Sequence, residues 1–236
     1  MSTELLISET FVSVQGEGKL TGVPSWFVRT SGCNLRCRWC DTPYASWAPE
    51  GGRRSVESLI AEARASGVQH AVLTGGEPMI FEPIVALSTG LRGTGIHVTI
   101  ETAGTVDQAG VHADLMSISP KLADSTPIND PRDPGGAWAE RHEARRLNVD
   151  VLNTLIAGSA DRQLKFVVSS PADLPEIDTL LDSLRGWDSA DVMLMPEGVV
   201  TPEPESVRWV VEACTERGWR YCSRLHIELF GDTRGT

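Results

Sequence analysis

The apolar residues of this 236-residue chain gather in short runs, and between the runs they recur every three or four positions. The runs are nearly continuous rather than alternating, which is typical of strands covered on both faces, as in a parallel sheet. The pattern predicts seven such strands, at 25–30, 70–74, 97–101, 115–119, 164–169, 191–195 and 220–225.

Four segments between these runs have a helical pattern. The segment 55–66 begins at Ser55, a residue suited to cap a helix, and repeats apolar residues on one face. The segment 201–217 has the clearest signals, because Thr201 can cap it, Pro202 fits its first position and Gly218 ends it. The other two predicted helices are 83–91 and 173–184.

Strands that alternate with helices indicate βα units with right-handed crossovers. Six or seven strands are too few for a full eightfold barrel, so we expect an α/β fold, a partial, open parallel βα barrel. Neither an internal repeat nor a linker-like change of composition interrupts the chain, and residues 1–236 are predicted to form one domain. The long loop 122–136 suits either a lid or a mobile segment. The segment 138–146, "WAERHEARR", suggests a solvated helix face, and His142 and Glu143 lack the H-E-x-x-H zinc pattern.

Charge and hydropathy narrow the class of partner. The formal net charge of -11 argues against a broad nucleic-acid surface and fits a small-molecule or protein partner. No apolar run approaches the roughly 20 residues of a membrane span, and the N-terminus lacks the pattern of a signal peptide. A cytoplasmic protein without a membrane partner is expected.

Three of the five cysteines, Cys33, Cys37 and Cys40, have the spacing C-x3-C-x2-C directly after a predicted strand. The carboxyl ends of parallel strands are where ligands bind in such folds. A structural zinc site needs four protein ligands, whereas three thiolates suit a 4Fe–4S cluster with one open iron. A zinc-stabilised binding module remains the alternative. Cys214 and Cys222 are expected to pack in the core.

Further polar segments follow the ends of other predicted strands. In "TGGEP" (74–78) two glycines allow close approach of a ligand, and Glu77 can accept from an ammonium group. Gln15 and Glu17 in "QGEG" share a side if extended and suit an aminopyrimidinone edge, while Arg29 suits a carboxylate. Taken alone, each of these features is better explained by a glycine-rich turn or by an arginine paired with an acid.

The cysteine motif, with Trp39 before Cys40, resembles the radical S-adenosylmethionine (SAM) superfamily. The order "QGEG", "FVRTSGCNLRCRWCDT", "TGGEP", "ETAGT", "SPK" resembles its 7-carboxy-7-deazaguanine synthase family. The resemblance implies a 4Fe–4S cluster on the three cysteines, SAM, and Mg²⁺ at Thr42. The residues implied for SAM are Trp39, Cys40, Asp41, Gly75, Gly76, Glu77, Glu101, Thr102, Ser119, Pro120, Lys121, Met195, Pro196 and Glu197; those for substrate are Gln15, Gly16, Glu17, Arg29, Thr74 and His226.

The reaction that this resemblance implies is a lyase step of 7-deazapurine (queuosine) biosynthesis. 6-Carboxy-5,6,7,8-tetrahydropterin becomes 7-carboxy-7-deazaguanine, with ring contraction and loss of ammonia, after a radical derived from SAM abstracts a hydrogen atom. A flavodoxin- or ferredoxin-like electron donor and a homodimer are also implied. The alternative is a glycyl-radical-enzyme activase, which does not explain the polar set Gln15, Glu17 and Arg29. Many relatives end sooner after the histidine, so no role is expected for the terminal carboxylate of Thr236.

Overall fold

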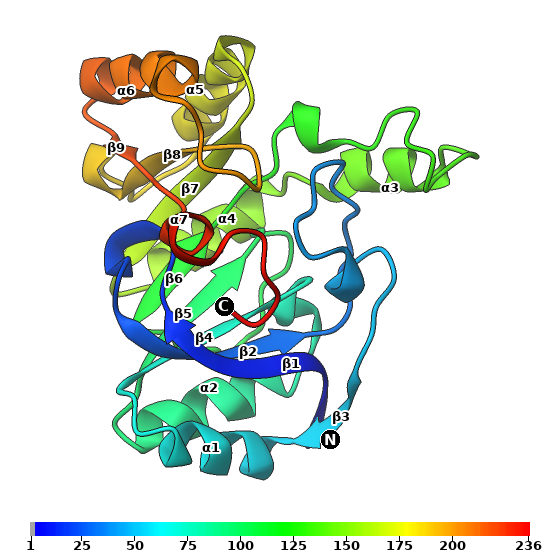
Figure 1. Ribbon diagram of the computed structural model, residues 1–236, viewed down its shortest axis with the longest axis vertical. Coiled ribbons are helices and arrows are strands. Elements are labelled where there is room, and N and C mark those ends of the chain that lie inside the picture. The colour runs from blue at the N-terminus through cyan, green and yellow to red at the C-terminus, as the bar shows by residue number, and fades with distance from the viewer. Residues whose placement is uncertain (1–2) are drawn as a thin grey trace.

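The computed structural model describes residues 3–236, which contain one nine-stranded sheet in the order β3-β1-β2-β4-β5-β6-β7-β8-β9 (Figure 1). The strands from β2 to β9 run parallel, whereas β1 is antiparallel to both β2 and β3. The sheet curves without closing, because β3 and β9 are its edges, and the predicted partial, open βα barrel is confirmed. The strands are β1 (Glu4–Val14), β2 (Pro24–Thr30), β3 (Gly52–Ser55), β4 (His70–Gly75), β5 (His97–Thr102), β6 (Leu115–Ile118), β7 (Arg162–Val168), β8 (Val192–Pro196) and β9 (Arg220–Tyr221).

Helices follow most of the parallel strands. They are α1 (Val56–Ala65), α2 (Ile84–Gly93), α3 (Ala137–Arg145), α4 (Val149–Gly158), α5 (Leu174–Ser183), α6 (Pro204–Arg217) and α7 (Leu225–Phe230). Short 3-10 turns lie at η1 (Gly18–Leu20), η2 (Pro43–Ala45), η3 (Pro78–Ile80), η4 (Ala123–Ser125), η5 (Pro171–Asp173) and η6 (Ser189–Asp191). Within residues 3–236 no helix has the length and apolar character needed to cross a bilayer.

All seven predicted strands are present, although the last is short. β9 ends at Tyr221, and Leu225, which was predicted to lie in it, begins α7. The sequence reading missed β1 and β3. In β1 only Leu5 and Ile7 are buried, because an antiparallel strand near the sheet edge alternates apolar with polar residues and makes no continuous apolar run.

The four predicted helices are present, but α6 begins later than predicted. Ser55 caps α1 as expected, with its hydroxyl accepting from the backbone N–H of Ser58. Pro204 disfavours helical geometry at Glu203, which is extended at φ -67° and ψ 141°. The predicted start, with Thr201 as the cap and Pro202 in the first turn, was therefore wrong. Helices α4 and α7 were not predicted.

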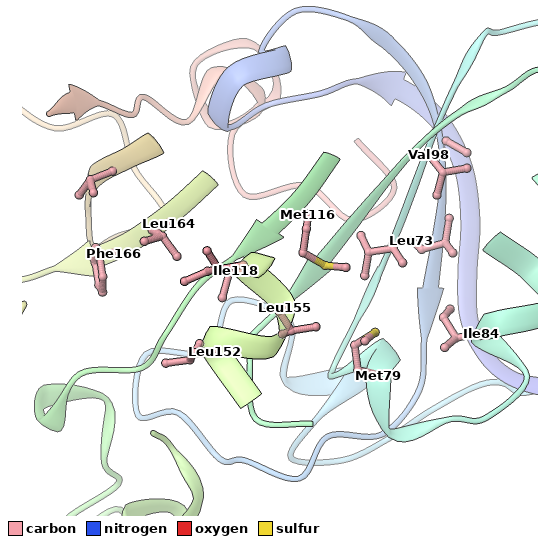
Figure 2. Packing of buried hydrophobic residues seen from close by; sticks show 14 of the residues in the cluster. Leu73, Met79, Ile84, Val98, Met116, Ile118, Leu152, Leu155, Leu164 and Phe166 are labelled. Atoms are coloured by element: carbon pink, nitrogen blue, oxygen red, sulfur yellow. The ribbon is translucent and has the colours of Figure 1, made fainter. Parts of the chain in front are cut away.

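The main core lies between the outer, convex face of the sheet and the helices α1, α2, α4, α5 and α6. Figure 2 shows Leu152 and Leu155 of α4 packed over Ile118 and Leu164 of the sheet. Along β7, Leu164, Phe166 and Val168 belong to this core, while Lys165 and Val167 point to the opposite, inner face. The helices thus cover one face and leave the inner face to other groups.

A buried histidine holds the amino ends of three parallel strands together. His70 at the start of β4 is 3% exposed, and its ring nitrogens lie 2.7 Å from Ser25 Oγ and 2.8 Å from Thr99 Oγ1. Burial, with a smaller contribution from the nearby His97, lowers the pKa of His70 to about 4. The ring is neutral at pH 7, and it is buried with both nitrogens paired.

The core predicts a large loss of stability for Phe166→Ala. Phe166 is fully buried and points away from the inner face, so truncation should lower the free energy of unfolding by about 3–5 kcal/mol. Urea denaturation measures this. Val200→Ala, at a position that is 74% exposed, is the control and should change it by less than about 0.5 kcal/mol. Equal effects of the two substitutions would contradict the assigned core.

Acid should destabilise the fold partly through His70. In the unfolded chain His70 is protonated below a pKa near 6.5, whereas in the folded protein it is protonated only below about pH 4. The free energy of unfolding therefore falls as the pH drops from 6.5 to 4. At pH 5 this contributes a loss of about 2 kcal/mol relative to pH 7.5. The loss measured by urea denaturation between these pH values should be smaller by that amount in His70→Gln. An identical loss in the variant would refute the assignment.

Candidate active site

A cavity of about 780 Å³ opens on the inner face of the sheet, at the carboxyl ends of the parallel strands. Side chains from opposite ends of the chain meet there because these strands end at one edge. All six predicted substrate residues line it, and so do most of those predicted for SAM and Mg²⁺. The lining includes Gln15, Gly16, Glu17, Arg29, Trp39, Cys40, Asp41, Thr42, Thr74, Gly75, Gly76, Glu101, Thr102, Ser119, Lys121, Met195, Glu197 and His226.

The three predicted cluster cysteines lie on the loop between β2 and η2. Cys40 lines the cavity, and its Sγ lies 3.1 Å from Ser46 Oγ. Cys33 is half-buried and Cys37 is buried, and neither lines the cavity. All five cysteines of the chain are free thiols.

The donor set of this loop fits an iron–sulfur cluster. Burial, followed by the nearby Glu77, raises the pKa of Cys33 to about 12, and burial also raises that of Cys37. Ligands must be thiolates, so a bound group has to supply positive charge and displace these protons. Among residues 3–236, no three His, Cys, Asp or Glu side chains gather around a point that could hold one metal ion. The cysteines of a 4Fe–4S cluster need no such point, since each ligates its own iron.

Two glycines are required by close approaches at the rim of the cavity. A Cβ on Gly76 would lie 2.3 Å from the carbonyl oxygen of Gly32 and 2.5 Å from that of Ala45, so only glycine lets β4 end against the cysteine loop. A Cβ on Gly16 would lie 2.0 Å from Nδ1 of His226. The sequence therefore brings His226, on α7, against the "QGEG" segment.

Glu77 lies outside the cavity. It is fully buried, and its carboxylate accepts from the N–H of Met79 (3.0 Å), the hydroxyl of Thr102 (2.8 Å) and the N–H of Ala103 (2.7 Å). Burial raises its pKa against the effect of these bonds. In this structure Glu77 ties the end of β4 to that of β5. Pro120 and Pro196 also lie outside the lining.

A chain of paired charges, with the buried Lys165 at its centre, crosses the floor of the cavity. Lys165 of β7 is 5% exposed; its ammonium group pairs with Glu17 and lies 3.1 Å from Oε2 of Glu101. Arg224 binds Glu17 through Nε at 3.1 Å and also pairs with Asp41, next to the last cluster cysteine. Burial alone would raise the pKa of Glu17, but Lys165 and Arg224 hold it well below its usual value. Glu17 is thus ionised near pH 7.

The sequence reading missed both cations of this chain. Lys165 had a signal: it is the one charged residue within the apolar run "LKFVVS", where a lysine needs a partner to be buried. No feature of the sequence indicated a role for Arg224, because it lies in a segment predicted as a strand. His226, next but one, has a lowered pKa, chiefly through burial, and is neutral at pH 7.

Arg29 is held by a carboxylate on the opposite strand. Glu9 and Arg29 are directly paired in the register of β1 and β2, and Arg29 Nε lies 2.7 Å from Glu9 Oε1. Glu9 also accepts from the Tyr44 hydroxyl at 2.9 Å and from Arg234 Nε at 3.1 Å. Arg234 stacks over Tyr44 at 4.0 Å, and so the C-terminal tail 231–236 folds back and lines the cavity.

The remaining predicted residues surround the cysteine loop. Lys121 donates to Ser119 Oγ at 2.8 Å and lies 5.5 Å from the ring centre of Trp39. Thr42 Oγ1 lies 3.8 Å from the sulfur of Cys40. A cation, an aromatic ring and a hydroxyl therefore border the sulfur that faces the cavity.

Comparison with known proteins agrees with this arrangement. Residues 27–158 match the model of the radical SAM superfamily. A 7-carboxy-7-deazaguanine synthase from Rhodopirellula baltica is 52% identical over 235 residues, covering 99% of this chain and 90% of the relative. One from Halobacterium salinarum is 47% identical over 240 residues, covering 98% and 93%. The crystal structure of QueE from Escherichia coli has a TM-score of 0.72 at 26% identity, covering 95% of this chain and 96% of that one.

These relatives favour neither the glycyl-radical-enzyme activase nor the zinc-binding module. They are matched over nearly their whole length, and the matched region contains both the three-cysteine loop and the polar groups that surround the cavity. The chain therefore belongs to the 7-carboxy-7-deazaguanine synthase family of the radical SAM superfamily.

Proposed function

We propose that the protein is a lyase that converts 6-carboxy-5,6,7,8-tetrahydropterin into 7-carboxy-7-deazaguanine, with ring contraction and release of ammonia, for 7-deazapurine (queuosine) biosynthesis. One observation carries the proposal: Gln15, Glu17 and Arg29 line the same cavity as Cys40. A polar heterocycle and a group bound at the cysteine loop would thus be neighbours. The near full-length similarity to named synthases supports the reaction.

The polar lining suits a carboxylated aminopyrimidinone. Ionised Glu17 can accept hydrogen bonds from the amino and ring N–H groups, and Gln15 can donate or accept beside it. Neutral His226 has one donor and one acceptor nitrogen against Gly16. Arg29 offers a guanidinium for the substrate carboxylate, and Thr74 a hydroxyl at the end of β4.

The family implies a 4Fe–4S cluster and SAM, and we assign the cluster to Cys33, Cys37 and Cys40. When bound there, the cluster and SAM would together supply the radical chemistry of the reaction, while the protein would hold and shield them. Lys121 is suited to the SAM carboxylate, and the ends of β4, β5, β6 and β8 to the rest of the molecule. We further propose Mg²⁺ at Thr42, whose hydroxyl is a hard oxygen ligand beside Cys40.

Four wider assignments belong to the same proposal. A single domain over residues 1–236 is supported by one sheet and by a core cluster that extends from Leu5 to Cys214. A cytoplasmic location is supported by five free cysteines, as expected in a reducing compartment. A homodimer and a flavodoxin- or ferredoxin-like electron donor are supported by the family resemblance.

Anaerobic reconstitution tests the function. The protein, loaded with iron and sulfide and reduced, should convert 6-carboxytetrahydropterin to 7-carboxy-7-deazaguanine when SAM and Mg²⁺ are added, as measured by mass spectrometry. Cys40→Ala should abolish the product, because Cys40 is the cluster cysteine that faces the cavity. Cys214→Ala, in the distant core, is the matched control and should retain activity.

Two other outcomes would contradict parts of the proposal. A brown protein that cleaves SAM but leaves the pterin unchanged would refute the substrate. A colourless protein with stoichiometric zinc would refute the cluster and the reaction together.

Substrate recognition by Glu17 is testable separately. Glu17→Gln removes a charged acceptor, and hydrogen bonds to charged groups contribute about 1.5–3 kcal/mol, so KM for the pterin should rise about 10- to 100-fold. In this variant Lys165 still pairs with Glu101, and Arg224 still pairs with Asp41, so the protein should still fold. Glu57→Gln, on the exposed first turn of α1, is the control. A KM that stays at the wild-type value in Glu17→Gln would rule out this role.

A further inference from the structure

The loop between the first two cluster cysteines is contacted by α3, the helix after the long segment 122–136. These contacts are made at Arg36. The side chain of Trp138 lies against its guanidinium, 4.0 Å from ring centre to Cζ, and Nδ1 of His142 accepts from its backbone N–H at 3.2 Å. Trp138 and His142 are four residues apart, so both point from the same face of α3. One face of α3 therefore supports the cysteine loop, while the opposite face is exposed, as predicted.

Hydrogen bonds fix the ring of His142 in one tautomer. His142 is fully buried. Nδ1 accepts from Arg36, so Nε2 carries the hydrogen and donates to Ser125 Oγ at 2.9 Å, and Ser125 donates onward to the carbonyl of Leu122 at 2.6 Å. Burial, followed by the charge of Arg146, lowers the pKa of His142 to about 4, and the ring stays neutral.

Hydrogen bonds at both ends hold α3 in place, so its contacts with the cysteine loop can position that loop. The Asp133 carboxylate accepts from the N–H groups of Trp138 and Ala139 at 2.8 and 2.9 Å and caps the start of α3. At the other end, Arg146 donates to the carbonyl of Lys121 at 3.1 Å, at the end of β6. α3 thus connects the segment that follows β6 to the cysteine loop.

Arg36 passes this restraint to the cysteines. Its Nη1 donates to the carbonyl of Cys33 at 2.8 Å and to that of Leu35 at 2.7 Å. With its backbone N–H fixed by His142, Arg36 sets the shape of the turn from Cys33 to Cys37. Residues that hydrogen-bond to the segment carrying metal ligands orient those ligands and affect how tightly the metal centre is bound.

We propose that His142 is a positioning residue for the iron–sulfur cluster, fixing the backbone of the loop between Cys33 and Cys37 through Arg36. The proposal rests on the assignment of the cluster to the three cysteines made above. It gives a role to the segment after β6, whose histidine has no place among the groups that line the cavity.

A matched comparison within the chain separates positioning from general packing. His70 is also buried with both ring nitrogens bonded, but its partners are hydroxyls at the amino ends of the strands, opposite to the cysteine loop. His142→Leu removes both hydrogen bonds. His142→Gln can restore them, with the amide oxygen toward Arg36 and the amide nitrogen toward Ser125.

The experiment measures cluster loss. Wild-type protein, His142→Leu, His142→Gln and His70→Leu are reconstituted anaerobically, an iron chelator is added, and the visible absorbance of the cluster is followed. His142→Leu should lose its cluster about 10- to 100-fold faster than wild type. His142→Gln and His70→Leu should remain close to wild type.

Three results would overturn the proposal: a wild-type rate in His142→Leu, equal rates in His142→Leu and His142→Gln, or equal rates in His142→Leu and His70→Leu. If His142→Leu does not fold, Ser125→Ala replaces it, and a wild-type rate there overturns the proposal as well. A wild-type protein that binds no cluster would refute the cluster assignment and this inference together. That failure differs from one confined to the variants.

Discussion

The buried ammonium group of Lys165 is the constraint on which the site depends. An unpaired cation cannot be buried without a large cost in free energy, so Lys165 requires the carboxylates of Glu17 and Glu101 on either side. Glu17 then pairs with Arg224, which pairs with Asp41 beside Cys40. This chain of charges fixes the first loop, the middle strands, the cysteine loop and the C-terminal segment relative to one another.

The cysteine loop depends on supports from elements that are distant in sequence. The end of β4 reaches it because Gly76 has no side chain, and Trp47 donates to the carbonyl of Cys37 at 3.0 Å. The backbone N–H of Arg38 donates to the backbone carbonyl of Ser125 at 2.8 Å. A loop with little secondary structure of its own is therefore held in one shape by backbone hydrogen bonds to its neighbours.

Local patterns predicted what is locally determined. The buried parallel strands make continuous apolar runs, and the cysteine spacing and glycine-rich turns follow the strand ends, so the partial barrel could be inferred from them. Most of the cavity lining was instead implied by the resemblance to the synthase family. β1 was missed because one of its faces is partly solvated, and α6 was misplaced because a second proline, Pro204, excludes an earlier start. Lys165, Arg224 and His142 were not assigned roles, because their partners are distant in the chain: Glu17 lies 148 positions from Lys165 and 207 from Arg224, and Arg36 lies 106 from His142.

The C-terminal tail shows how one carboxylate couples two parts of the site. Its length beyond His226 gave no reason to expect it near the substrate, yet Thr236 lines the cavity. Arg234 causes this, because it stacks on Tyr44 and pairs with Glu50 at 3.0 Å as well as with Glu9. Glu9 also holds Arg29, so the tail and the arginine assigned to the substrate carboxylate share an acceptor. The position of one guanidinium therefore depends on that of the other, and the end of the chain is part of the wall of the site.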